Sequence, residues 1–428
     1  MRKTKTITIS LVLLLLIVGT AWGSGQEDQA AAEEEPITLK LLRMGTQDIW
    51  VNYVRDFLER YEERFPNVTI DYEYVAPPDL PQKLNVAVAG GTPPDVVGGA
   101  IMHVALYAAN GVYMPLNDFF DEWSGFDDVS QSMLNVSLYD GLYYGLAYHP
   151  DPYVWAYRKD YFRDAGLDPD NPPDTWAELA SMAPQLTMRD GAIVTRAGYL
   201  MPINDFLTFV PMAVMNGARF LDDEQQPTFN SPEWIEALEF MTDLYKENVT
   251  LDTMMAQEWS SSAFAKGNAA IAQVSSAMLA QFFAAYPDKV DEVGYFTLHK
   301  DEETLLTSNW NGAWLYSITS ASKNKDWAWS FIEEWMSPEE MWASYEATGN
   351  VPVLHSLRDR FTAANPALND ALFAGVETGL GAPLVTWAPV LFRHLEAAMA
   401  EAYYGEKAPS QALSDNYAAL LDEIANAQ

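Results

Sequence analysis

The chain has 428 residues, of which 60 are acidic and 25 are basic, and its formal net charge at pH 7 is −35. A surface of this charge repels phosphate backbones and anionic lipids, which argues against nucleic-acid binding and against a role at a membrane surface. Because no cysteine occurs, disulfides, thiolate metal sites and a lipid-modified cysteine are excluded.

The N-terminal segment has the composition of a secretory signal. Basic residues are followed by the apolar run LVLLLLIVG and by the small residues Ala21 and Gly23. This order predicts a signal peptide over residues 1–23, with an uncleaved anchor as the alternative. Residues 24–36 are polar and acidic without apolar periodicity, so we expect a disordered lead-in.

In the first part of the chain, the spacing of apolar residues is in turn that of a strand, a helix and a strand. Residues 39–44 form an apolar run typical of a strand, and apolar residues then recur every three or four positions over residues 50–65, as on one helix face. Alternation over residues 68–74 predicts a second, half-buried strand. Strand, helix and strand in this order indicate an α/β fold.

The segment LPQKLNVAVAGGTPPDVV, residues 80–97, predicts a helix, a glycine- and proline-rich turn and a short strand. We expect Asp95 to fix the turn between a strand and the loop that follows it. The loop behind it, with Gly98, Gly99, Met102 and His103, is the better candidate for ligand contacts.

Further motifs follow along the chain: YYGLAYHPDPYVWAYRKDYFRDAGLD, PPDTWAEL, FAKGNAAIA, NWNGAWLYSITSASKNKDWAWSFIEEWMSPE and GNVPV. Together with FLERYEERFPNVTIDYEY and AGGTPPDVV, their order resembles that of bacterial extracellular solute-binding proteins of family 1. These are the maltose-binding-protein-like receptors of ABC sugar importers. The resemblance spans nearly the whole mature chain and rests on the order of the motifs.

The resemblance implies an α/β fold of the periplasmic-binding-protein type II, with two discontinuous lobes, a hinge and a ligand cleft between the lobes. Carried onto this sequence, lobe 1 comprises residues 37–148 and 299–350, and lobe 2 comprises residues 153–293 and 355–428. About 400 mature residues also exceed what one core usually supports.

Helix caps and apolar stripes support this organisation. Thr175 and Glu178 form a capping box, and Ser231 and Ser337 each precede a proline at a helix start. The stripes at residues 235–244 and 327–335 are typical of core packing, so we exclude them from the site.

The resemblance also places candidate ligand contacts along the chain. The turn after the first strand presents Gln47 and Asp48, with Trp50 just beyond it, although Asp48 can alternatively act as a helix cap. The chain is expected to cross first between the lobes near residues 147–153. There His149 and Asp151 align with an acidic contact of the family, and Pro150 and Pro152 are departures that would stiffen this crossing. The candidates in the second half of the chain are Asn204, Asp205, Ser275, Ser276, Trp310, Asn311, Trp387 and Arg393.

The sequence shows no distinctive motif of a glycosidase, a metal-dependent enzyme or a dinucleotide-binding enzyme. With so many acidic residues no carboxylate pair stands out for glycoside hydrolysis, and the five histidines lack metal-ligand spacing. Gly379-Leu380-Gly381 lacks the third glycine of a dinucleotide loop. We therefore expect neither catalysis nor a cofactor nor a metal.

The predicted function is that of a periplasmic substrate-binding protein, acting as a monomer, that captures a carbohydrate for an ABC transporter permease. Fourteen tryptophans and 22 tyrosines suit stacking on an oligosaccharide or glycoside. Two alternatives remain open: a receptor for a non-sugar solute, such as a polyamine or a sugar phosphate, and a ligand sensor for a membrane kinase.

Overall fold

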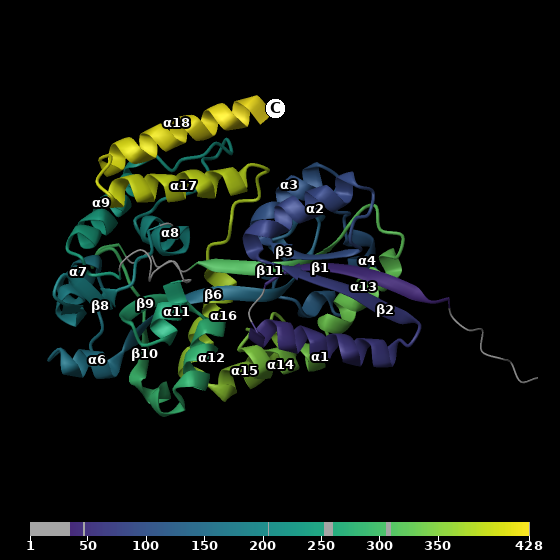
Figure 1. The fold of residues 1–428 in the computed structure, drawn as a ribbon, viewed down its shortest axis with the longest axis horizontal. Coiled ribbons are helices and arrows are strands. Elements are labelled where there is room, and N and C mark those ends of the chain that lie inside the picture. The colour runs from purple at the N-terminus through teal and green to yellow at the C-terminus, as the bar shows by residue number, and fades with distance from the viewer. Residues whose placement is uncertain (1–34, 46–47, 204, 252–259, 305–309, 428) are drawn as a thin grey trace, which may run out of the picture. The chain divides into compact units, whose positions relative to one another are not determined.

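The computed structural model describes residues 35–45, 48–203, 205–251, 260–304 and 310–427 (Figure 1). The predicted signal peptide and nearly all of the lead-in lie outside these residues. Within the described part of the chain, no helix is both long and apolar enough to cross a membrane. Residues 36–428 group into one compact unit.

The strands of the main sheet follow the order β2-β1-β3-β11-β6-β9-β8-β7, and β10 pairs with β6. β1 lies parallel to β2 and β3, while β11 runs antiparallel to both β3 and β6. The strands are β1 (Ile37–Met44), β2 (Val68–Val75), β3 (Val96–Ala100), β4 (Leu138–Tyr139), β5 (Leu142–Tyr143), β6 (Leu146–Arg158), β7 (Met188–Asp190), β8 (Ile193–Tyr199), β9 (Ala269–Ser275), β10 (Val293–Phe296) and β11 (Asn311–Ile318).

Helices cover both faces of the sheet (Figure 1). They are α1 (Asp48–Arg64), α2 (Leu80–Ala89), α3 (Val104–Ala109), α4 (Asn117–Glu122), α5 (Gln131–Asn135), α6 (Lys159–Asp164), α7 (Trp176–Leu186), α8 (Phe206–Met215), α9 (Pro232–Lys246), α11 (Ser260–Ala265), α12 (Ser276–Ala285), α13 (Lys325–Trp335), α14 (Pro338–Thr348), α15 (Arg358–Ala364), α16 (Pro366–Thr378), α17 (Ala388–Tyr403) and α18 (Pro409–Ala427). Short 3-10 turns include η2 (Ile101–His103).

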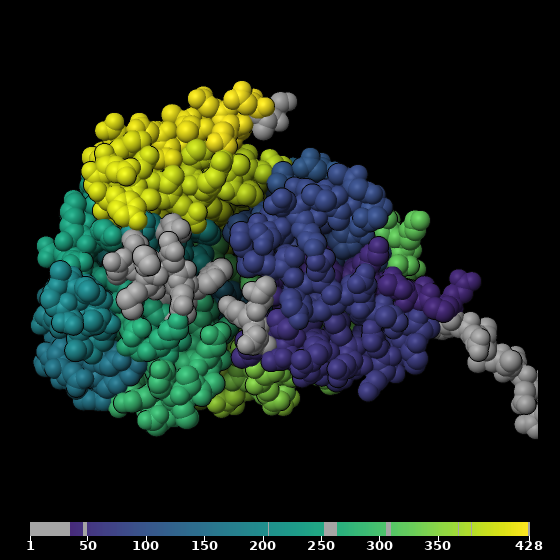
Figure 2. Space-filling view, viewed as in Figure 1, coloured from purple at the N-terminus to yellow at the C-terminus, as the bar shows by residue number. Residues whose placement is uncertain are grey.

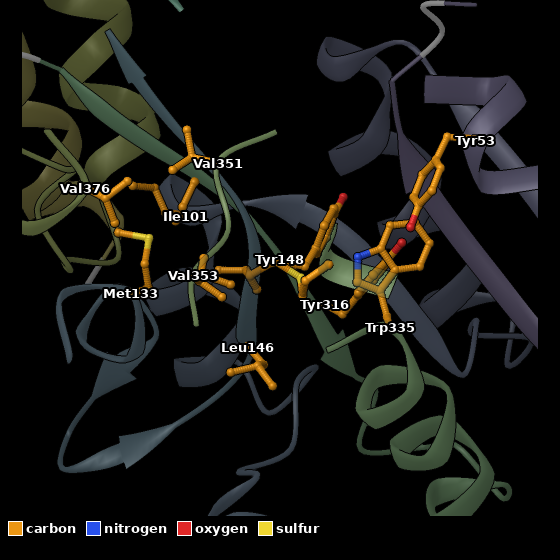
Figure 3. Close-up of a cluster of buried hydrophobic side chains, with 14 of the residues drawn as sticks. Tyr53, Ile101, Met133, Leu146, Tyr148, Tyr316, Trp335, Val351, Val353 and Val376 are labelled. Carbon is orange, nitrogen blue, oxygen red and sulfur yellow. The ribbon is translucent and has the colours of Figure 1, made fainter. Parts of the chain in front are cut away.

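The alternating direction of the side chains along β1 explains why helices pack on both faces of the sheet. Leu39 and Leu41 join the core formed with α1, whereas Leu42 and Met44 pack with α2 and α3. Figure 3 shows the centre of the first core, where the rings of Tyr148 and Tyr316 stack with centroids 4.0 Å apart. A second large core gathers the second half of β6 with α7, α8, α9 and α17.

Strand β6 connects the two halves of the sheet. Its residues 146–152 pair with β11, and its residues 153–158 pair with β9 and β10. Pro150 and Pro152 lie inside this strand, and the pairing with β11 has a register shift between Trp314 and Leu315. Proline cannot donate to a ladder, so irregular pairing is expected at this point.

Several local predictions are confirmed. The Asp95 carboxylate accepts hydrogen bonds from the Lys40 amide at 2.9 Å and from the Ser322 hydroxyl at 2.5 Å. Thr175 and Glu178 form the predicted capping box at the start of α7. The buried faces of α9 and α13 carry the two apolar stripes.

Two local predictions are wrong. Gly98 and Gly99 do not lie in a loop, because β3 continues to residue 100 and the chain leaves the strand only at η2. A Cβ atom on Gly98 would lie 2.7 Å from Cγ of Arg43, so the strand needs glycine there to admit the arginine. Ser337 caps α14, but Ser231 makes no capping bond at α9 and instead donates to the Glu233 carboxylate at 2.6 Å.

Candidate functional site

The candidate site is centred where β6 and β11 pair. Side chains alternate along a strand, so His149, Asp151 and Tyr153 share one face of β6. On β11, Trp314 lies opposite His149 and Gly312 lies opposite Asp151. The Tyr153 amide donates to the carbonyl oxygen of Trp310 at 2.8 Å. The two strands thus present one continuous row of aromatic and acidic side chains.

One end of this row is a cluster of three rings, here called the stacked wall, made of Trp50, His149 and Trp314. The ring centroids of His149 and Trp50 are 4.3 Å apart, and those of His149 and Trp314 are 5.2 Å apart. Trp50 and His149 are buried, and Trp314 is half-buried. The stack brings together two predicted site residues, Trp50 and His149, and adds Trp314, which the sequence analysis did not select.

A buried cation lies behind the stacked wall. The guanidinium carbon of Arg43 is 5.6 Å from the ring centroid of Trp50, 5.5 Å from that of Trp314 and 5.4 Å from that of Tyr148. Arg43 is fully buried, donates from Nε to the Tyr148 hydroxyl at 3.1 Å, and has no partner for Nη1 or Nη2. The aromatic faces therefore replace the carboxylate that a buried arginine usually has.

His149 is neutral in this environment. Burial, and secondly the positive charge of Arg43, lower the pKa of its imidazole to about 3. Both ring nitrogens are buried without a hydrogen-bond partner. A neutral imidazole offers one donor and one acceptor, so His149 can meet a hydroxyl group from either side.

Asp151, the next residue in the row, has an Oδ1 atom that is buried without a partner. Burial raises the pKa of this carboxyl to about 6, although a hydrogen bond from the Ser275 hydroxyl acts in the opposite direction. The desolvation of the charged form therefore outweighs the hydrogen bond. The predicted residues Asp151 and Ser275 are in contact.

The other end of the row, here called the acidic wall, combines aromatic rings with two carboxylates. The Trp310 ring packs edge-on against Phe206 and Phe392, with centroids 5.3 and 5.8 Å apart. Phe206 and Phe392 stack on each other at 4.3 Å. Asp205 precedes Phe206 and accepts the Leu207 amide at 3.0 Å as the N-cap of α8. Trp310 is only 3% exposed, so its indole packs in the core rather than forming an open platform.

Glu396 completes the acidic wall and was not identified from the sequence. It lies one helical turn after Phe392 on α17 and is half-buried. Burial, and secondly the charge of Asp205, raise the pKa of the Glu396 carboxyl to about 7. On sequence alone this residue looks like one of many acidic residues on a helix surface, and no local pattern marks it as half-buried.

The remaining predicted residues lie in different places. Ser276 starts α12, and its hydroxyl is buried without a partner. Asn311 points to the opposite sheet face and donates to the Val376 carbonyl at 3.0 Å.

Trp387 is half-buried at the start of α17. Arg393 is exposed and pairs with Glu423 of α18. Gly99 is buried in β3, Asp48 begins α1, and Gln47 and Asn204 lie outside the described residues.

A groove of about 590 Å³ lies elsewhere, between the end of α1 and helices α13 and α14, and includes Arg64, Trp123 and Glu339 in its lining. None of the predicted site residues lines it. Among the described residues, no group of three or more histidine, aspartate or glutamate side chains could hold a metal ion.

A model of bacterial extracellular solute-binding proteins matches residues 56–370. The mannitol-binding protein of Pseudomonas aeruginosa is 25% identical over 316 residues, which are 68% of each chain.

Solved structures show the same fold. A solute-binding protein of an ABC transporter from Thermotoga lettingae, bound to α-D-tagatose, matches with a TM-score of 0.79 and 23% identity. The match covers 90% of this chain and 98% of that chain. The GacH receptor of Streptomyces glaucescens, studied unliganded and with acarbose, has a TM-score of 0.80, 20% identity and the same coverage. These likenesses confirm the predicted fold class.

Proposed function

The chain belongs to the bacterial extracellular solute-binding protein family, and on that premise we propose that it captures a carbohydrate and delivers it to an ATP-driven importer. The observation that carries the proposal is the row on β6 and β11, where aromatic rings alternate with unpartnered polar groups. Sugars have apolar faces and hydroxyl edges, which match such a surface.

The mannitol-binding relative and the tagatose- and acarbose-bound structures support a polyhydroxylated ligand. Those ligands differ in size, so they leave the length of the ligand open. Trp50, His149, Asp151, Asp205 and Glu396 are the contacts that we propose. In this proposal Trp314 and Trp387 supply the accessible aromatic surface.

The proposed mechanism is hinge closure without catalysis. Residues 37–148 and 299–350 would form one lobe, and residues 153–293 and 355–428 the other. The pairing of β6 with β11 along its first half and with β9 and β10 along its second half supports a hinge at this strand. A ligand that contacts both lobes shifts the equilibrium toward the closed state.

The proposed location is the periplasm and the proposed partner is the permease of an importer in the inner membrane. The family's extracellular character supports the location. A non-sugar receptor or a sensor for a membrane kinase would use the same fold, so the ligand screen below and the genes next to this one distinguish the alternatives.

A thermal-shift screen of the mature protein tests the proposal. The panel contains polyols, monosaccharides, oligosaccharides, polyamines and sugar phosphates. A ligand present at 100 times its dissociation constant adds about 2.7 kcal/mol of stability, which is readily measured. A shift with one series of sugars or polyols supports the proposal. A shift with sugar phosphates or polyamines alone contradicts it and leaves the solute-binding fold intact.

A further inference from the structure

We infer that Arg43 is a positioning residue of the stacked wall: its guanidinium holds the half-buried Trp314 ring in the orientation in which that ring can stack on a sugar. This inference rests on the proposed function, in which Trp314 supplies accessible aromatic surface. Arg43 itself is fully buried, so its effect on a sugar has to pass through the rings that it contacts.

Core packing alone does not account for an arginine at this place. Neither Nη1 nor Nη2 of Arg43 has a hydrogen-bond partner, and no aspartate or glutamate in the described part of the chain forms an ion pair with it. An unpaired buried charge is costly, and replacing buried charged groups by apolar residues of similar volume is often neutral or stabilising. The role of Arg43 is therefore sought in what its guanidinium contacts.

The guanidinium lies over three rings that come from three elements. Its carbon atom is 5.6 Å from the ring centroid of Trp50 on α1, 5.5 Å from that of Trp314 on β11 and 5.4 Å from that of Tyr148 on β6. A cation attracts the faces of aromatic rings, so it favours the arrangement in which all three faces turn toward it. A hydrocarbon side chain in the same space would pack without such a directional preference.

The guanidinium is itself fixed in place. Its Nε donates to the Tyr148 hydroxyl at 3.1 Å, and the Tyr148 ring stacks on Tyr316 at 4.0 Å (Figure 3). The side chain of Asn350 donates from Nδ2 to the carbonyl oxygen of Tyr148 at 3.0 Å. Tyr148, Tyr316 and Asn350 are all buried. Arg43 thus connects the stacked wall to a tightly packed part of the first core.

Two glycines make room for this arrangement. A Cβ atom on Gly98 would lie 2.7 Å from Cγ of Arg43. A Cβ atom on Gly45, the residue after β1, would lie 2.9 Å from Cζ3 of Trp314 and 3.6 Å from Nη1 of Arg43. The Trp314 ring therefore packs directly against the backbone at the end of β1, next to the guanidinium.

Trp314 is the ring of the stacked wall that is most open to solvent. Trp50 is 1% exposed and His149 is 2% exposed, whereas Trp314 is half-buried. A ring with one free face can turn away from the wall unless its other contacts hold it. Arg43 supplies such a contact, and it does so without touching the sugar.

The first test needs no ligand. The mature protein is labelled with 5-fluorotryptophan, and the fluorine resonance of Trp314 is identified by its loss in Trp314→Phe. We expect one sharp Trp314 resonance in the wild type and in Arg43→Lys, which keeps a cation, and a broadened or displaced one in Arg43→Met. Arg43→Gln, which is also neutral, replaces Arg43→Met if that variant does not fold.

Arg196→Met is the matched control. Arg196 is also buried and its guanidinium carbon lies 4.0 Å from the ring centroid of Tyr161, but it belongs to β8 and not to the stacked wall. Its replacement should leave the Trp314 resonance unchanged. An unchanged Trp314 resonance in the neutral Arg43 variant overturns the inference, and so does equal broadening in Arg43→Lys.

The second test connects the geometry with binding, by calorimetry with mannitol, D-tagatose and acarbose. For each solute that the wild type binds, Arg43→Met should weaken binding by at least about tenfold and Arg43→Lys by less than about threefold. In a Trp314→Ala background, Arg43→Met should have no further effect. Equal losses in both backgrounds would show that Arg43 acts independently of Trp314 and would overturn the inference. If the wild type binds none of the three solutes, the result counts against the proposed function, and the fluorine spectra decide the inference.

Discussion

The imidazole of His149 stacks on the indole of Trp50 with ring centroids 4.3 Å apart and ring planes inclined by 29°. The Trp314 ring lies 5.2 Å from the same imidazole and 6.5 Å from the Trp50 ring, so the three rings form one cluster. The histidine thus contacts two tryptophans, one from α1 and one from β11. The rings join three elements that are distant in the sequence.

His149→Phe should change how stability depends on pH. The folded-state pKa of about 3 lies below the ordinary value of 6.5, so the unfolded state binds the proton more readily. The wild type therefore has its full stability from this group above pH 6.5 and loses it as the pH falls toward 3. At pH 5 the loss is about 2 kcal/mol, and the phenylalanine variant should not show it. Urea denaturation at pH 8 and pH 5 measures the difference.

His355→Phe, at an exposed position, serves as the control for this experiment. Its pH dependence should follow that of the wild type. Parallel stability curves for the wild type and His149→Phe would mean that the folded protein protonates His149 without penalty.

Glu396→Gln should stabilise the folded protein at high pH. The folded-state pKa of about 7 lies above the ordinary 4.5, so ionisation costs stability as the pH rises from about 4.5 through 7. After allowance for solvent screening we expect a gain of about 1 kcal/mol at pH 8 and none at pH 4. Denaturation midpoints at both pH values provide the measurement, with Glu406→Gln as the exposed control. An equal gain at both values would rule out relief of a buried charge.

Asp95→Ala should destabilise the protein by about 3 kcal/mol, because the buried carboxylate satisfies the Lys40 amide and the Ser322 hydroxyl. Ligand affinity of the folded variant should remain that of the wild type. Asp71→Ala, on the exposed face of β2, should have little effect on stability. A large loss of affinity in folded Asp95→Ala would place Asp95 in the site instead of the turn.

Trp310→Ala and Trp387→Ala should have different effects, although both were sequence candidates for stacking. Trp310 packs against Phe206 and Phe392, so its loss should cost about 3 to 5 kcal/mol of stability. Trp387 is half-buried, and its loss should weaken binding by about 1 to 3 kcal/mol with a smaller effect on folding. Denaturation and calorimetry separate the two effects. Unchanged affinity in Trp387→Ala would remove it from the site.

Features set by nearby residues could be predicted from the sequence. The strand at residues 39–44, the helix that follows it and the Thr175 capping box all depend on periodicity or on contacts within a few residues. Each of these was confirmed.

Features that depend on distant pairing could not be predicted. Trp314 lies opposite His149 only because β11 pairs with β6, and no local pattern encodes that register. From the sequence alone, Arg43 would be expected at the surface, near the end of a strand. In the structure, rings from three other elements enclose it. The sequence predicts Gly98 in a loop, whereas in the structure it lies in β3 and makes room for the Arg43 side chain.

The continuity of β6 has a consequence for how this protein tolerates insertions and deletions. His149, Asp151 and Tyr153 share one face because the strand runs unbroken from residue 146 to residue 158. A single residue inserted between His149 and Tyr153 would turn one part of the row to the opposite face, whichever half of the sheet kept its register. Length changes should therefore be harmful in this short segment even though it lies near a proposed hinge, and new specificities are better sought by substitution at these three positions.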